Sequence, residues 1–193
     1  MEKTIYSRNV NCIKCAVVGD GMVGKTSMLY SYSRGVFNHK YTATVLETYT
    51  VSLRTGEDTI LVKIYDTAGQ NDFEKFRVDP YLESDVIILC FSETDMESFS
   101  NVIQVWMPEI KQHVNRKIPV ILIGTKTDLR GRVKSVIKRE DGLQMAKLIG
   151  AAAYVECSAR NGVGLDILFT TIIECASRTN KRKNSFLNRL LKR

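Results

Sequence analysis

The sequence predicts an α/β fold, in which a six-stranded, mostly parallel sheet carries helices on both faces. Short apolar segments rich in β-branched residues alternate along the 193 residues with longer segments of helical periodicity. Two of the short segments, 86–91 and 120–124, contain no polar alternation, which is typical of strands buried on both faces. A composition of 44% hydrophobic and 25% charged residues fits a globular domain.

The elements can be assigned in chain order. A β-branched run before Gly19 predicts a first buried strand, and two alternating segments around residues 54–58 predict a hairpin. Pro108 should bend or interrupt a long helix. An apolar stripe from Leu165 to Ala176 predicts a last helix on the sheet. The predicted strands are 13–18, 50–53, 59–65, 86–91, 120–124 and 154–157; four of five expected helices lie at 25–33, 98–114, 139–149 and 165–176.

The net charge of +7 is concentrated at the C-terminal end. From residue 178 onward there are seven Lys and Arg and no Asp or Glu, which leaves 21 basic against 21 acidic residues in the body. A neutral body argues against nucleic-acid binding. We therefore expect an N-terminal extension at 1–11, one domain at 12–177 and a basic tail at 178–193. Five cysteines and no apolar signal segment favour a cytoplasmic protein.

The first predicted strand is followed by the pattern G-x-x-x-x-G-K-[ST]. Its glycines let backbone N–H groups point at phosphate oxygens, and the next helix adds its positive N-terminal end. We expect Lys25 to reach the β- and γ-phosphates and the Thr26 hydroxyl to bind Mg²⁺. The alternative is a flexible glycine turn. The predicted phosphate-binding residues are Gly19, Asp20, Gly21, Met22, Val23, Gly24, Lys25, Thr26 and Ser27.

A second polar segment, residues 66–70, follows the third predicted strand. Asp66 can hold Mg²⁺ through water, Gly69 can offer its N–H to a γ-phosphate, and Gln70 can orient an attacking water. Alone, the segment could be a polar turn. Ligands of such sheets bind beyond the carboxyl ends of the strands, so this segment and the phosphate loop should meet.

A third segment, after the fifth predicted strand, suits a guanine base. The Asp128 carboxylate can accept hydrogen bonds from N1–H and from the exocyclic amine, and a buried carboxylate left half-paired would reject adenine. The stem of Lys126 can pack over the base. A helix-capping Asp is the alternative. Thr125 and Leu129 complete this segment, and Ser158 and Ala159 can place a backbone N–H on guanine O6.

The long polar segment 36–49 is predicted to be a switch. Thr44 lies centrally, where it could close onto Mg²⁺ and the γ-phosphate, and a loop ordered only by that phosphate changes with the nucleotide. Phe37 could pack edge-on against the base or simply pack beneath the loop.

The order of these motifs resembles the Ras superfamily over residues 11–177, and several strings are similar to the Rac-like branch of the Rho family. Those strings are Asp66–Gln70, Thr125–Asp128, Glu156–Ala159, Tyr41–Tyr49, Phe91–Ser92, and Ser98, Phe99, Asn101 and Val102 with Trp106. The resemblance implies a P-loop NTPase fold and a GTP/GDP switch that hydrolyses GTP slowly, with Gln70, Lys25 and Thr44 as catalytic residues. It also implies exchange factors, GTPase-activating proteins, and effectors that bind through Tyr41, Thr44, Val45, Leu46, Glu47 and Tyr49.

Several positions depart from that family. Met22 replaces a small residue, and either faces solvent or crowds the γ-phosphate. Ala43, Leu46 and Glu47 alter the effector segment, and residues 129–141 are too few for the extra helix of Rho proteins. A divergent Ras- or Rab-like protein and a GTP-locked scaffold are therefore alternatives. An ATP-using kinase, which has the same phosphate loop, is a third alternative that Lys126 and Asp128 disfavour.

We expect no prenyl anchor on the tail, because the last cysteine is Cys175, within the last predicted helix. As a helix, residues 185–193 would be amphipathic and basic, which favours weak binding to an anionic membrane. A solvated tail and a nuclear-targeting signal are the alternatives.

Overall fold

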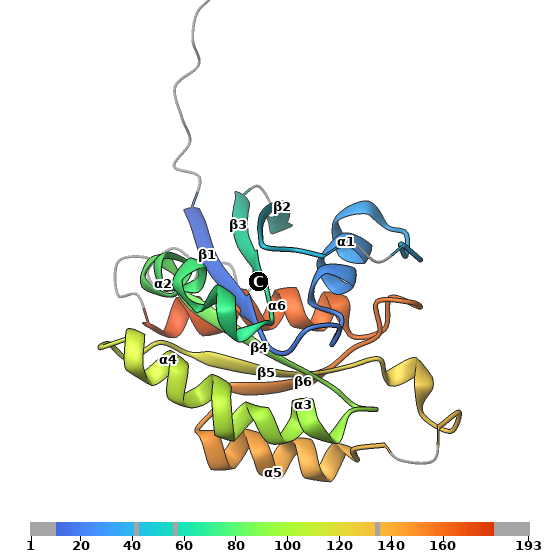
Figure 1. Cartoon of the computed structure of the whole chain (residues 1–193). Helices are drawn as coiled ribbons and strands as arrows, with labels where there is room; N and C mark the ends of the chain where they lie inside the picture. Colours follow the sequence, from blue (N-terminus) through green and yellow to red (C-terminus); the bar gives the residue numbers. More distant parts are fainter. Residues whose placement is uncertain (1–10, 41–42, 56–57, 134–135, 180–193) are drawn as a thin grey trace, which may run out of the picture.

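The computed structural model of the chain describes residues 11–40, 43–55, 58–133 and 136–179 (Figure 1). Its six-stranded sheet has the order β2-β3-β1-β4-β5-β6. Only the β2–β3 pair is antiparallel, so the sheet is mostly parallel, as predicted. The strands are β1 Asn11–Val18, β2 Leu46–Thr55, β3 Asp58–Thr67, β4 Val86–Ser92, β5 Val120–Thr125 and β6 Ala153–Glu156.

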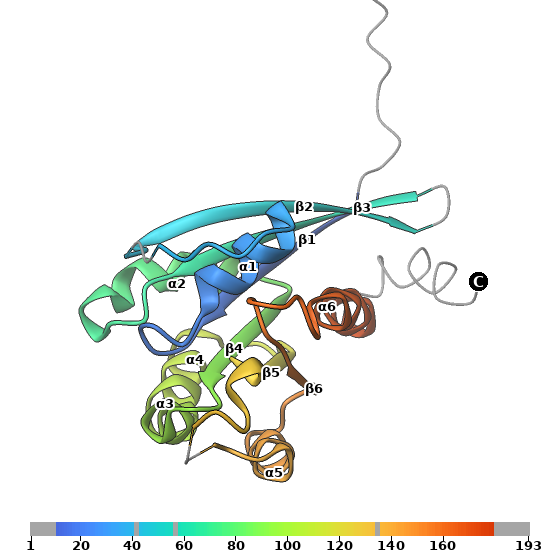
Figure 2. The ribbon, with the colours of Figure 1, turned by 90° about the vertical axis from the view of Figure 1, so that its right-hand side faces the viewer.

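Helices cover both faces of the sheet (Figure 2). One hydrophobic cluster joins α1 and α6 to one face, and a second joins α2, α4 and α5 to the other. In the described part of the chain, no helix has the length and apolarity of a bilayer-spanning segment. The helices are α1 Lys25–Arg34, α2 Glu74–Glu83, α3 Met96–Asn101, α4 Met107–His113, α5 Arg139–Ile149 and α6 Leu165–Thr179, with the short turns η1 Asn71–Phe73 and η3 Thr127–Leu129.

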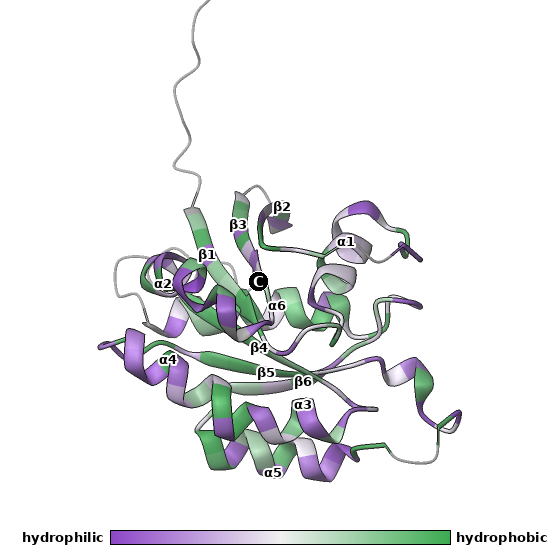
Figure 3. Ribbon diagram, viewed as in Figure 1, coloured by the Kyte–Doolittle hydropathy of each residue, from purple (hydrophilic) through white to green (hydrophobic). Residues whose placement is uncertain are grey.

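The central strands form the core. Every residue of β4 and β5 is buried, which explains why their sequences lack polar alternation (Figure 3). Cys15, Cys90, Cys157 and Cys175 are buried among aliphatic side chains of the first cluster. Ring stacking of Tyr32 on Phe169, at 3.6 Å between centroids, fastens α1 to α6. The core therefore fixes the sheet edge from which the functional loops emerge.

The hairpin is longer than its hydrophobic pattern predicts. β2 begins at Leu46 and not at residue 50, so the end of the predicted 36–49 loop belongs to a strand. Its residues look loop-like because β2 is an edge strand with much of its length exposed. β1 begins at Asn11 and α6 continues to Thr179, so the predicted domain boundaries fall inside these two elements. Between η3 and α5, residues 130–133 and 136–138 form no further helix.

The long predicted helix 98–114 is continuous but contains a π-helical segment, η2 Val102–Trp106, between α3 and α4. Pro108 lies in the first turn of α4, where its missing N–H is tolerated. The N–H of Met107 bonds to the carbonyl of Val102, five residues earlier. The predicted irregularity is therefore a widened turn just before Pro108.

Close packing of α5 against β6 depends on Gly142. A Cβ at this position would lie 2.2 Å from the hydroxyl oxygen and Cζ of Tyr154. An alanine there would require either the Tyr154 ring or α5 to shift.

Candidate functional site

The phosphate loop lines a cavity of about 160 Å³ together with residues of α1, the end of β3, and Asn38, Lys40 and Thr44. Lys25 is buried, and its Nζ donates hydrogen bonds to the carbonyls of Gly19 and Asp20, both at 2.7 Å. Burial lowers the pKa of Lys25. A desolvated ammonium among N–H groups is a strong site for phosphate oxygens. The predicted residues at this cavity are Gly21, Met22, Gly24, Lys25, Thr26, Ser27, Thr44 and Gly69.

Three oxygen-bearing side chains converge beside this cavity. Thr26 Oγ1 lies 2.9 Å from Thr44 Oγ1 and donates to Asp66 Oδ2 at 2.6 Å. Asp66 Oδ1 is buried and has no hydrogen-bond partner among the residues that the structure describes. Burial raises the pKa of Asp66 to about 6, against the lowering effect of the Thr26 hydrogen bond. An orphaned carboxylate oxygen among hydroxyls is an arrangement that a hard cation satisfies.

The loop that follows β3 touches the phosphate loop at Gly69. A Cβ there would lie 2.3 Å from the Asp20 carbonyl carbon and from the Gly21 nitrogen, so only glycine allows this approach. The next residue, Gln70, is exposed and does not line the cavity. Its carbonyl accepts a hydrogen bond from Arg77 Nη1 at 2.9 Å. The structure thus places the backbone of Gln70 near the phosphate loop and leaves its side chain at the surface.

Met22 lies at the phosphate cavity with a largely exposed side chain, which favours the solvent-facing alternative. Its side chain is 73% exposed, yet the residue lines the phosphate cavity. Its φ of 61° is left-handed, a conformation that costs a non-glycine residue energy.

An adjoining cavity of about 190 Å³ is lined by the predicted base-binding residues. The carboxylate of Asp128 accepts a hydrogen bond from the buried Ser158 hydroxyl at 2.6 Å. Burial lowers the pKa of Lys126. Gly24 and Ser27 line both cavities, so the two form halves of one nucleotide-sized site. The predicted residues here are Phe37, Thr125, Lys126, Asp128, Leu129 and Ala159.

Side-chain hydroxyls tie the two halves together. Thr125 Oγ1 lies 2.5 Å from the carbonyl oxygen of Val23 and 2.9 Å from that of Phe91, and its one proton can be donated to either. Ser31 Oγ donates to the carbonyl of Ala159 at 2.7 Å. The base-binding loops are therefore held against the phosphate loop and α1.

The effector segment is only partly described, because Tyr41 lies outside the described residues. Val45 and Leu46 are 46% and 43% exposed. The Tyr49 hydroxyl donates to Glu47 Oε2 at 3.1 Å, and burial, followed by the Glu47 charge, raises the pKa of Tyr49 to about 12. Val45 and the first residue of β2, Leu46, thus present apolar side chains at the surface next to Thr44 in the sequence.

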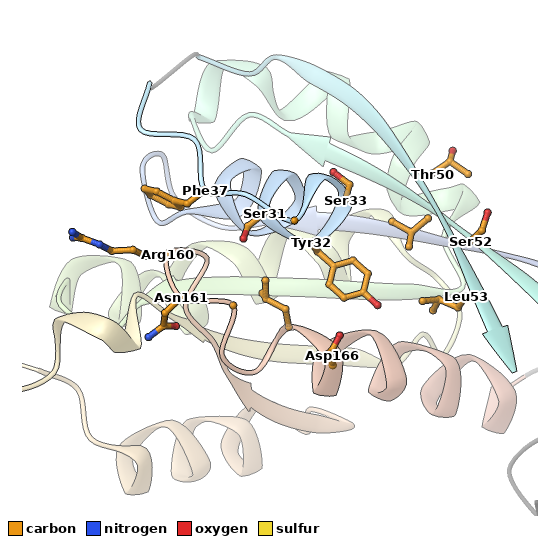
Figure 4. Close-up of a pocket in the computed structure, with 14 residues that line it drawn as sticks. Ser31, Tyr32, Ser33, Phe37, Thr50, Ser52, Leu53, Arg160, Asn161 and Asp166 are labelled. Carbon is orange, nitrogen blue, oxygen red and sulfur yellow. The ribbon is translucent and has the colours of Figure 1, made fainter.

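A wider hollow of about 740 Å³ lies between α1, β2 and the start of α6 (Figure 4). It contains none of the phosphate-loop residues and shares only Phe37 and Arg160 with the base-binding cavity. The predicted nucleotide-binding residues therefore gather at the two smaller cavities and not at this hollow.

Some lining residues were not predicted. Tyr30, Asn38 and Lys40 border the phosphate cavity, and Arg160 borders the base cavity. Tyr30 lies four residues after Thr26 on the same helix face, a spacing that could have identified it. Asn38 and Lys40 depend on the path of the loop, for which the sequence has no comparable signal.

This fold, with a phosphate loop at one end of its site and a paired Asp128 at the other, defines the class of guanine-nucleotide-binding P-loop proteins. The sequence model that defines the Ras family matches residues 14–178 of this chain. The human "Rho-related GTP-binding protein RhoD" is 38% identical over 192 residues, which cover 94% of this chain and 90% of that relative. The chain belongs to the Ras superfamily of small GTPases and, within it, to the Rho family. It is a GTP-hydrolysing signalling switch.

Proposed function

We propose that the two adjoining cavities hold GTP or GDP in the orientation that the loops predict. The convergence of Thr26, Thr44 and Asp66 beside the phosphate loop is the observation that carries this assignment. Phosphates would lie over the loop at Lys25, and the base would lie between Lys126, Phe37 and Asp128. The remaining residues of Gly19–Ser27 and of the base loops support these contacts through their backbone.

Mg²⁺ fits the oxygen set of Thr26, Thr44 and Asp66. Mg²⁺ in phosphate sites keeps several waters and uses few protein oxygens, and Asp66 Oδ1 is the buried atom without a partner. When bound, the ion supplies positive charge at the β- and γ-phosphates. Thr26 and Thr44 would hold it directly and Asp66 through water.

Hydrolysis is proposed to depend on Gln70, which orients the attacking water, and on Lys25 and Thr44, which hold the γ-phosphate. The Gly69 N–H would donate to the same phosphate. Because the Gln70 side chain is exposed, the free protein should hydrolyse GTP slowly. An arginine supplied by a GTPase-activating protein would raise the rate by about 10³–10⁵-fold.

Specificity for guanine is assigned to Asp128, which Ser158 orients at 2.6 Å. A carboxylate held in this way offers two acceptor oxygens, which the N1–H and the exocyclic amine of guanine can both satisfy. Adenine has no such pair of donors at that edge, so it would leave the carboxylate half-paired.

Rho-family GTPases interact with exchange factors, activating proteins and effectors, and we propose the same classes of partner for this chain. The exposed Val45 and Leu46, with Glu47 and Tyr49, would form the effector surface. The proposed location is the cytoplasm, with reversible membrane association through the basic residues after 179, which lie outside the described residues. Flotation of the full chain with anionic liposomes tests this, and binding that survives truncation after Thr179 would contradict it.

Single-turnover hydrolysis of pre-bound GTP tests the site assignment. The wild-type protein should convert GTP to GDP slowly, and Gln70→Leu should abolish conversion while GTP binding is retained. Equal rates in the two proteins would remove Gln70 from the mechanism.

A further inference from the structure

The Asp20 carboxylate in the phosphate loop is engaged by the helix that runs from α3 to α4. Trp106 Nε1 donates to Asp20 Oδ1 at 2.5 Å, and Asn101 Nδ2 donates to Oδ2 at 2.7 Å. The carbonyl of Asp20, and not its carboxylate, accepts the hydrogen bond from Lys25. An acidic side chain in a loop that binds phosphate would repel its ligand unless its charge were satisfied elsewhere. The two helix donors fulfil that requirement.

The π-helical segment makes this pair of contacts feasible. Residues five apart on an α-helix point about 140° away from each other. A π turn, closed by hydrogen bonds between residues five apart, brings such residues onto one face. Asn101 and Trp106 are five positions apart and flank or end the π-helical segment η2 Val102–Trp106. The irregular turn therefore serves a contact with the phosphate loop.

The Trp106 ring also supports the loop that carries Gln70. The Arg77 guanidinium carbon lies 4.9 Å from the ring centroid, and both side chains are buried. Arg77 Nη1 donates to the carbonyls of Ala68 and Gln70, both at 2.9 Å. Two bonds of 2.7 Å to Glu109 fix the guanidinium in this position. The Trp106 indole thus contacts both Asp20 of the phosphate loop and Arg77, which holds the loop that carries Gln70.

We propose that Trp106 is a positioning residue for GTP hydrolysis, which sets the phosphate loop through Asp20 and the backbone of Gln70 through Arg77. The inference rests on the role proposed for Gln70 above. The two loops already touch at Gly69, so a shift of either one changes where Gln70 stands relative to the γ-phosphate. When a group that orients a reactant is displaced by even about 1 Å, the reaction that depends on this orientation slows strongly.

Trp106→Phe tests the proposal, because it keeps an aromatic ring next to Arg77 and removes the N–H that binds Asp20. Single turnover of pre-bound GTP reports the chemical step and not affinity. We expect the rate to fall at least about tenfold. The matched control is Phe99→Leu, which alters a ring of α3 that packs on Phe91 and should leave the rate within about twofold. A Trp106→Phe rate within twofold of wild type, or an equal loss in Phe99→Leu, would overturn the inference.

A double-mutant cycle with Asp20→Asn separates a specific contact from general loosening. If Trp106 acts through Asp20, the double variant should be hardly slower than the slower single variant. If the rate losses of the two single variants multiply in the double variant, Trp106 does not act through Asp20. Gln70→Leu, measured alongside, keeps the two hypotheses apart: a normal rate there refutes the proposed role of Gln70, whereas a slow rate there with a normal Trp106→Phe rate refutes only the role of Trp106.

The unaltered chain offers a test that requires no folded variant. Trp106 is its single tryptophan, so emission excited at wavelengths that tyrosine does not absorb reports this ring alone. We expect the emission to differ between protein loaded with GDP and protein loaded with a non-hydrolysable GTP analogue. Identical emission in the two states would show that the ring does not sense the Gln70 loop, and would overturn the inference.

Discussion

Replacing Glu93 by glutamine should stabilise the protein progressively, relative to wild type, as the pH rises from 5 to 8. Glu93 directly follows β4 and is fully buried. Its Oε1 accepts a 2.7 Å hydrogen bond from Arg130, but its Oε2 has no partner within the described part of the chain. Arg130 also pairs with Glu156 at 2.7 Å, so its charge is shared between two carboxylates. The surrounding charged and titratable groups include Arg139 and Tyr154, which both bond to Glu156.

The size of the effect follows from the pKa. Burial raises the pKa of Glu93 from 4.5 to about 7, although Arg130 works against this shift. Between these two values the folded protein binds more protons than the unfolded chain, so stability falls as the pH rises. A shift of this size corresponds to about 3 kcal/mol, of which roughly 2–3 kcal/mol develops between pH 5 and pH 8. A glutamine side chain at this position cannot ionise and would avoid that loss.

Urea unfolding of the GDP-loaded protein, at a fixed excess of GDP and Mg²⁺, measures this difference at several pH values. Effects of pH on nucleotide binding are common to both proteins and cancel. Glu83→Gln is the control, because hydrogen bonds from Lys14 and Tyr65 lower the pKa of the exposed Glu83, and its substitution should not become more favourable as the pH rises. A Glu93→Gln difference that stays flat or falls with pH would mean that Arg130 keeps Glu93 ionised throughout, and would refute the reasoning.

Three further substitutions test the site and its supports. Ser158→Ala removes the hydrogen bond to Asp128 and should weaken GDP binding about tenfold, since bonds to charged groups contribute about 1.5–3 kcal/mol; unchanged affinity in a fluorescent-GDP titration would contradict this. Met22→Gly should raise the free energy of unfolding by about 1 kcal/mol, because it releases the left-handed φ of 61°; a lower thermal midpoint would argue against strain there. Arg77→Met leaves the buried Glu109 without its cation and should destabilise the fold by about 3–5 kcal/mol in urea unfolding, whereas a loss below about 1 kcal/mol would show that Glu109 finds another partner.

The sequence predicts the centre of the sheet better than its edge. The limits predicted for β4 and β5 differ from the structure by one residue at one end, because strands buried on both faces consist of uninterrupted apolar residues. β2 gains four residues before its predicted start, since an exposed edge strand lacks that pattern. The π segment has no signature in the periodicity beyond the warning from Pro108.

For the candidate site, the sequence identifies the loops but not their supports. Gly19–Ser27 and Asp128 follow from spacing, because each motif comes directly after a strand whose end is fixed by the sheet. The contacts of Asp20 with Trp106 join residues 86 positions apart. Such a pair depends on how the α3–α4 helix lies across the loop, a tertiary relation that no local pattern contains. Ser158 as the partner of Asp128 is likewise visible only after folding.

The absence of a side chain at Gly142 has a consequence for how α5 forms. α5 has 11 residues, and helices of that length are marginal on their own in water. An internal glycine costs a further ~1 kcal/mol relative to alanine. The same glycine allows Tyr154 to lie directly against the helix. The glycine thus weakens α5 as an isolated helix but lets it pack closely on β6. We therefore expect α5 to become ordered only when β6 joins the sheet. Its amide hydrogens should exchange with solvent in the same cooperative opening as those of the sheet.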